Sequence, residues 1–166
     1  MRPSIQLNAW YTEFARAKRA FRQHVRTARQ FWLLVQMLAW SVCLRTLRPF
    51  VSLQRLVRVA VPTRTRGDVQ ADDVLRYLQW LDAIGILART HKCLVRALVC
   101  HRSLTIAGVK STLLIGFDGE IGHSWVEVDG EAIFETQWAL DRYRPILAAH
   151  PGSRTLVRTK VAEKKN

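Results

Sequence analysis

The sequence contains few cysteines, and their arrangement does not suit a structural role. Its three cysteines, Cys43, Cys93 and Cys100, are an odd number without the spacing of a zinc site. No secretory signal opens the chain, because the first basic cluster lies too deep and no cleavage site follows it. We therefore expect a reduced, cytoplasmic setting with no disulfide framework, metal or other cofactor.

Acidic residues are also scarce. The chain has 13 Asp and Glu against 26 Lys and Arg, which gives a net charge of +13. Such an excess is typical of proteins that bind nucleic acid, an anionic membrane surface or an acidic protein. Composition alone does not choose among these partners.

Long apolar runs are absent. The longest, Phe31 to Leu44, is interrupted by Gln36 and Ser41 and is too short to span a bilayer. We interpret it as a core or interfacial helix. The 166 residues, of which 49% are hydrophobic, suffice for one globular domain with a helical extension.

The first half of the chain predicts helices. A basic amphipathic helix covers residues 12–29 and continues into the apolar run, which Pro49 ends. A short apolar segment follows at 51–60. After the polar breaker 62–68, Asp68 or Asp72 could cap a helix at 74–81. We predict a helical region at 1–62, a core domain at 63–150 and a flexible charged tail at 151–166.

The second half mixes a helix with strands. A helix should begin near Cys93 and end at Gly108, a suitable left-handed cap. Residues 109–117 alternate as a strand, and residues 123–135 predict a hairpin around Asp129-Gly130. Weak helical character extends from Trp138 to Ala149. The pattern predicts an α+β fold.

Cys93 and His123 are the candidate nucleophile and base. A helix N-terminus stabilises a thiolate and offers a backbone N–H to a developing oxyanion. The order of helix, strand and strand allows His123 to return to Cys93. Alone, each residue is more often structural, so the prediction rests on their combination. Cys43 and Cys100 lie within apolar stretches and are expected to be inert.

The group that orients His123 could be Asp129, Glu135 or Glu127. Asp129 lies in the turn, too far along an extended strand to reach His123. A three-residue loop would place Glu135 opposite His123, whereas a two-residue loop would turn Glu135 to the other face. Glu135 is our choice, with the register left open.

The Cys and His segments together resemble the lasso-peptide B protein family. In that family a Cys-Leu pair opens the central helix, Gly-Val precedes a strand, and His-x-Trp-Val-Glu leads into Asp-Gly. The matching positions here are Cys93-Leu94, Gly108-Val109, residues 123–127 and Asp129-Gly130. The basic segment LRTLRPFVSLQRLVR adds to the likeness, which extends from about Phe31 to about Leu140.

This resemblance implies a papain/transglutaminase-like core with an N-terminal helical extension, and a Cys93-His123-Glu135 triad in which Glu replaces the usual Asp. It also implies a cysteine peptidase that removes the leader of a lasso-peptide precursor before a separate macrolactam synthetase acts. Fused members carry a winged-helix leader-recognition domain, which we do not find in this sequence. A separate recognition protein is therefore expected as a partner.

Two other functions fit the same residues. A thioester at Cys93 could pass to an amine, which would make the protein an acyltransferase or amidase. Alternatively, the chain could be a basic binding module without catalysis. Because its arginines cluster away from the Cys-His segment, an acidic protein or anionic membrane suits that module better than nucleic acid.

Overall fold

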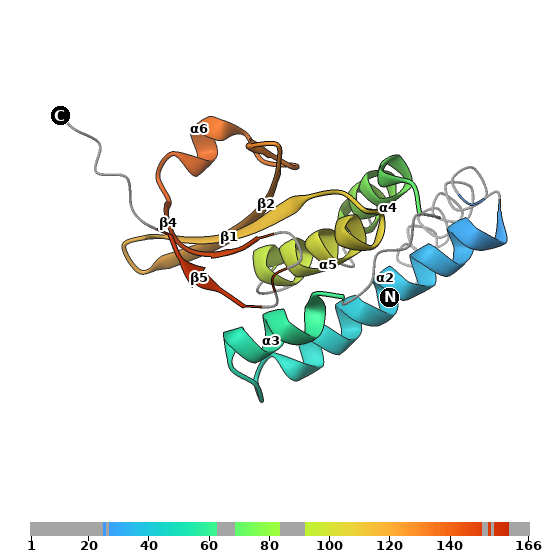
Figure 1. The fold of residues 1–166 in the computed structure, drawn as a ribbon, viewed down its shortest axis with the longest axis horizontal. Helices are drawn as coiled ribbons and strands as arrows, with labels where there is room; N and C mark the ends of the chain where they lie inside the picture. The colour runs from blue at the N-terminus through green and yellow to red at the C-terminus, as the bar shows by residue number, and fades with distance from the viewer. Residues whose placement is uncertain are drawn as a thin grey trace, which may run out of the picture. The chain divides into compact units, whose positions relative to one another are not determined.

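The computed structural model describes residues 25, 27–62, 69–83, 92–150, 153 and 155–159. The chain forms two compact units, Met1–Val35 and Gln36–Asn166, and the boundary lies within helix α2, Ala28–Leu47. All the strands belong to the second unit (Figure 1). The predicted basic helix at 12–29 lies mostly outside the described residues.

Helix α2 is longer than the apolar run that predicted it. It ends at Leu47, and a turn carries the chain through Pro49, as expected. Among the described helices, α2 alone has the length and composition to cross a membrane, which corrects the expectation that this segment is too short. Core helices of soluble proteins meet the same criterion, so length and composition do not establish a span.

Two short helices of the second unit bury one side each. Helix α3, Leu53–Ala60, buries Leu56, Val57 and Ala60. Helix α4, Ala71–Ala83, has Asp72 in its first turn, where a carboxylate suits the helix dipole. The buried side of α4 contains Val74, Tyr77, Leu78 and Leu81. Both helices pack against α5, Lys92–Ile106.

Helix α5 ends as predicted at a left-handed glycine. Gly108 has a φ of 80°, its N–H bonds to the Thr105 carbonyl, and the Val109 N–H bonds to the Leu104 carbonyl. These two bonds form a Schellman motif, which satisfies carbonyls that the last helical turn leaves without partners. The motif turns the chain directly into the first strand.

The sheet is antiparallel, with strand order β3-β2-β1-β4-β5. Helix α5 packs on β1 and β2 (Figure 1). A small cluster of Leu114, Trp125, Leu140 and Ala148 forms a further core. The strand bounds are β1, Ser111–Asp118; β2, Ile121–Val128; β3, Glu131–Ala132; β4, Arg144–Ala149; and β5, Val157–Arg158.

The prediction of a helix from Trp138 to Ala149 is wrong. Helix α6 covers only Gln137–Leu140, and β4 pairs with β1 from Arg144 onward. Pairing along β1 outweighs the weak local preference for helix. Strand β5 extends the sheet within the segment expected to be a tail.

Candidate active site

Cys93 is the second residue of α5 and thus lies in the first turn, as predicted. Its side chain is half-buried and forms no disulfide. Backbone N–H groups in the first helical turn have no partner within the helix, and the helix dipole is positive there. The position provides a backbone donor for an oxyanion.

His123 and Cys93 line the same cavity, which has a volume of about 230 Å³. His123 is the third residue of β2, rather than the first as the sequence suggested. Because β3 pairs with β2 only at Glu127 and Val128, His123 lies on an open edge of that strand. The sheet edge and the helix N-terminus together bring the candidate nucleophile and base to one cavity.

Glu135 lies beside His123, with its Oε1 3.4 Å from His123 Nε2. Nε2 therefore faces the carboxylate, and Nδ1 is the ring nitrogen that does not. The imidazole also stacks on Tyr143, with ring centroids 4.9 Å apart, and on Trp125 at 6.1 Å. These contacts restrict the orientation of the ring.

The hairpin register differs from the one on which the choice of Glu135 depended. Val128 pairs with Glu131, so the turn has two residues, and Asp129 and Gly130 both have positive φ. The three-residue alternative is wrong. Glu135 still reaches His123, because the ladder ends at Ala132 and Phe134, with a φ of 65°, redirects the chain.

The other acidic candidates have different surroundings. Asp129 is exposed in the turn, where its positive φ suits Asp or Asn. Glu127 Oε1 accepts a hydrogen bond of 2.9 Å from Trp125 Nε1. The structure therefore places Glu135, and neither of these two residues, in contact with His123.

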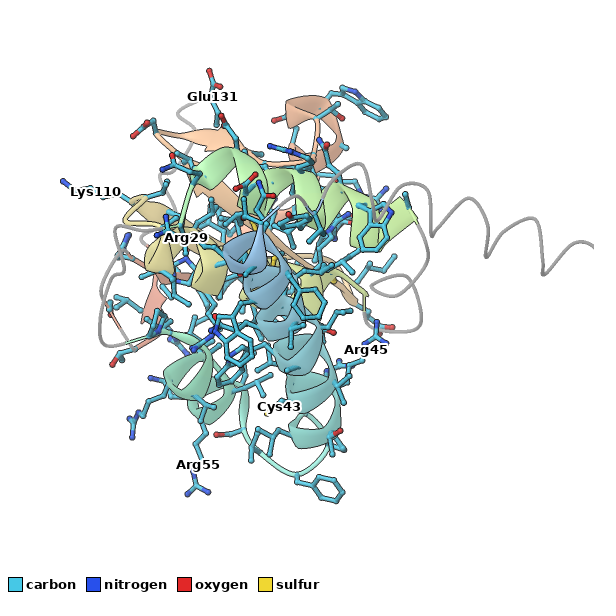
Figure 2. All side chains as sticks on the ribbon, turned by 90° about the vertical axis from the view of Figure 1, so that its right-hand side faces the viewer. Arg29, Cys43, Arg45, Arg55, Lys110 and Glu131 are labelled. Carbon is cyan, nitrogen blue, oxygen red and sulfur yellow. The ribbon has the colours of Figure 1, made fainter. Side chains whose placement is uncertain are left out.

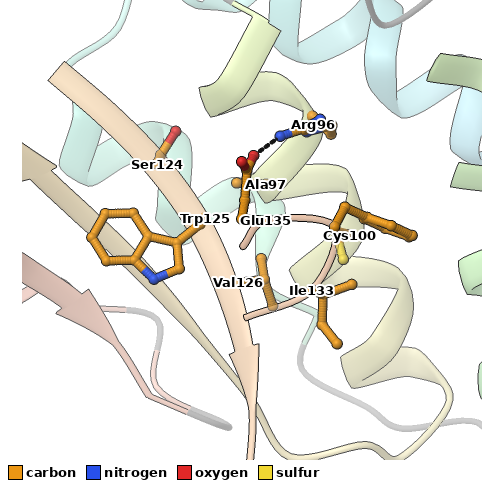
Figure 3. A pocket seen from close by; sticks show the side chains of 9 residues that line it. Arg96, Ala97, Cys100, Ser124, Trp125, Val126, Ile133 and Glu135 are labelled. Carbon is orange, nitrogen blue, oxygen red and sulfur yellow. Dashed lines mark hydrogen bonds and ion pairs between the residues drawn. The ribbon is translucent and has the colours of Figure 1, made fainter. Parts of the chain in front are cut away.

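Arg96 is a residue that the sequence analysis missed. It lies one helical turn after Cys93, and its guanidinium pairs closely with Glu135 (Figure 3). It also lies 3.5 Å from Asp82 of α4. The space beside this pair is about 10 Å³, room for at most one water molecule. The i, i+3 spacing from Cys93 was the available signal, because it places Arg96 on the same side of the helix.

The remaining cysteines are in different surroundings. Burial raises the pKa of the Cys100 thiol to about 12, which keeps it protonated and agrees with an inert role. Cys43 is half-buried in α2, so it is less enclosed than expected. Within the described ranges, no group of three or more His, Cys, Asp or Glu residues could hold a metal ion.

Comparison with protein families gives a match that covers most of the chain. Residues 33–148 match the model of the Transglutaminase-like superfamily. The chain belongs to this superfamily. Its α+β architecture, with Cys93 on a helix packed against an antiparallel sheet, is consistent with that membership. No curated protein and no solved structure matches the chain significantly.

Members of this superfamily generally catalyse reactions through a cysteine. The match begins at residue 33 and ends at residue 148. These limits are close to Phe31 and Leu140, between which the sequence resembles the lasso-peptide B proteins. Cys93, His123 and Glu135 all lie within it. The superfamily therefore indicates chemistry of the cysteine peptidase and acyltransferase type.

Proposed function

We propose that this protein is a cysteine peptidase that removes the leader from a lasso-peptide precursor. The observation that carries the proposal is the common cavity of Cys93 and His123, with Glu135 Oε1 3.4 Å from Nε2 of the imidazole. The resemblance to lasso-peptide B proteins supplies the substrate. The superfamily match supports cysteine chemistry but does not distinguish this substrate from others.

In the first half of the proposed reaction, His123 Nδ1 accepts the thiol proton and Cys93 Sγ attacks the scissile carbonyl. The Cys93 N–H donates to the resulting oxyanion. The tetrahedral intermediate collapses as His123 gives its proton to the leaving amine. The leader remains as a thioester on Cys93, and the core peptide leaves with a new amino group.

In the second half, His123 accepts a proton from water, and the hydroxide attacks the thioester carbonyl. Collapse releases the leader carboxylic acid, and the proton returns to Cys93 Sγ. Throughout both steps Glu135 holds the ring and stabilises the imidazolium. The role of Arg96 is to hold the Glu135 carboxylate against the ring.

The decisive experiment combines the purified protein with the precursor peptide and recognition protein encoded beside its gene, in water enriched in ¹⁸O. Peptide hydrolysis should give a core amine and a leader acid containing one ¹⁸O atom, both seen by mass spectrometry. An acyltransferase would instead give a leader amide without the label. If the precursor is only bound and stays intact, the chain is a binding module and the peptidase proposal is wrong.

The partners that we propose follow from the same resemblance: a winged-helix recognition protein that presents the leader, and a macrolactam synthetase that takes the core. The basic helix predicted at 12–29 would dock an acidic partner or an anionic membrane. Reversing Arg16, Arg19 and Arg26 to Glu should weaken that association, which pull-downs and liposome flotation at two salt concentrations would measure. Binding that is unchanged in both assays would remove the helix from this role.

A further inference from the structure

The cavity beside Cys93 has features that the catalytic residues do not use. Its volume of about 230 Å³ is below the roughly 300–1,000 Å³ of typical small-molecule sites. If compact, it spans roughly 8 Å, which is two to three residues of extended chain at about 3.3 Å each. It therefore suits the part of a peptide next to the scissile bond. Besides Cys93 and His123, its lining residues are Arg48, Leu53, Leu94, Ile115, Phe117, Gly122 and Ser124.

Arg48 is the cationic residue in this lining. It follows α2 directly, in the turn that leads toward α3. Among residues 36–62, 69–83 and 92–150, the carboxylates that form ion pairs do so with other cations, and none pairs with Arg48. A residue that lines a cavity and whose guanidinium has no protein carboxylate as partner can offer that guanidinium to an anionic ligand.

Ser124 supplies a second, independent signal. Ser124 is 2% exposed, and its Oγ has no hydrogen-bond partner within the described part of the chain. A buried hydroxyl without a partner is destabilising, so its presence calls for an explanation. Ser124 lines this cavity and also the small space beside Arg96 and Glu135, so an acceptor that reaches its Oγ, such as a carboxylate oxygen, would satisfy this hydroxyl.

The other walls are apolar, and Gly122 allows one of them to form. A Cβ atom at this position would lie 3.1 Å from Cε1 of the Phe117 ring, closer than ordinary contact. Glycine therefore permits the ring to pack over the start of β2 beside His123. Phe117, Leu94 and Ile115 can receive the methylene groups of a side chain that has a polar end.

We propose that this cavity binds an acidic side chain of the peptide substrate, within about two residues of the scissile bond. The carboxylate would bind Arg48 and accept a hydrogen bond from Ser124. The inference rests on the proposed peptidase function and adds a substrate class to it: peptides with Glu or Asp near the cleavage point.

The test measures peptide binding by the intact Cys93→Ala protein, so that it does not depend on turnover. Fluorescent hexapeptides place a single Glu at each position in turn, and a matching set places Gln there. At one position Glu should bind about tenfold more tightly than Gln. Arg48→Met should bring that ratio close to one, and Ser124→Ala should reduce it about threefold.

Reversing the charge at Arg48, together with a control variant, tests whether Arg48 itself binds the acidic side chain. With Arg48→Glu, a peptide with Lys at the selected position should bind better than its Glu counterpart. Arg55 of α3 is exposed, points away from the molecule and does not line the cavity (Figure 2), so Arg55→Glu should keep the original ratio. Thermal unfolding of each variant would show that it is folded.

The acidic subsite is wrong if no peptide binds, if no position distinguishes Glu from Gln, or if the preference persists in Arg48→Met. Failure of the peptidase proposal would look different. In that case the Glu preference and its loss in Arg48→Met would be observed, while protein with Cys93 intact would cleave none of the peptides or the precursor.

Discussion

Two regions of this protein each bring a cysteine, a histidine and a serine together. In one, Cys93, His123 and Ser124 line a cavity. In the other, Cys100, His101 and Ser111 are buried, and His101 Nδ1 lies 2.9 Å from Ser111 Oγ. The same three residue types therefore occur in two environments, and the cysteines of both belong to α5.

The environments decide which set can do chemistry. Burial raises the pKa of Cys100 to about 12 and lowers the pKa of His101 to about 4, so both are neutral in the folded protein near pH 7. His123 instead has the Glu135 carboxylate at 3.4 Å and a neighbouring cavity. Residue types alone thus cannot identify a catalytic pair. A charged partner and an adjoining cavity are the features that distinguish it.

The largest difference in activity should be between variants of the two cysteines. Cys93→Ala should abolish leader cleavage, a loss of at least about 10⁴-fold, because no other residue at the cavity can form the thioester. Cys100→Ala should retain activity after correction for the folded fraction. Rapid cleavage by Cys93→Ala, measured by mass spectrometry, would contradict the mechanism.

Replacing each of the two histidines should change kcat by amounts that differ almost as much. His123→Ala should lower kcat about 10³-fold, because it removes the base of the nucleophile-base unit. His101→Gln is the matched change in the interior and should leave kcat within a few-fold. If the two variants lose activity equally, the cavity histidine is not the base.

His101 should instead determine how the free energy of unfolding depends on pH. Burial lowers its pKa from 6.5 to about 4, so the unfolded chain binds a proton more readily than the folded one. The stability that the protein gains from keeping His101 neutral is fully present above pH 6.5. It is lost as the pH falls toward 4, and the total loss in the free energy of unfolding is about 3 kcal/mol. Urea unfolding between pH 7 and 4.5 should show this slope in the native protein and a smaller one in His101→Gln. Equal slopes would refute the assignment.

The smallest effect in this series concerns Glu135. Glu135→Gln keeps the size but removes the charge, and it should lower kcat by about tenfold to hundredfold because the ring loses its orienting carboxylate. Arg96→Met should produce part of the same loss, and Arg96→Lys should restore some of it. Asp129→Asn is the control, since asparagine tolerates the same turn, and should change kcat less than twofold. A silent Glu135→Gln beside a damaging Asp129→Asn would reverse our choice of third residue.

Much of this arrangement could be predicted from local signals in the sequence. The start of α5 near Cys93, its cap at Gly108 and the turn at Asp129-Gly130 are each determined by residues within one or two turns of backbone. The order of helix and strands then gave the α+β class. The roles of the candidate site residues stay predictions, which the variants above would test.

The parts that sequence reasoning missed depend on contacts between distant segments. Strand β4 exists because β1 offers it a pairing edge, which no local pattern around Arg144 reveals. The contact between Glu135 and His123 depends on Phe134 adopting a positive φ, an uncommon conformation for an aromatic residue. Arg96 and Glu135 lie 39 positions apart, so their pairing follows only from the packing of α5 near the hairpin.

The double contact of Arg96, with Glu135 and with Asp82, has a consequence for the order of folding. It joins α4, α5 and the segment after β3, whereas the β1–β2 hairpin closes through a tight local turn. Because closing long loops costs more chain entropy than closing short ones, we expect the hairpin to form early and the carboxylate to reach the imidazole late. A newly synthesised chain would then gain the proposed activity only once its tertiary structure is complete.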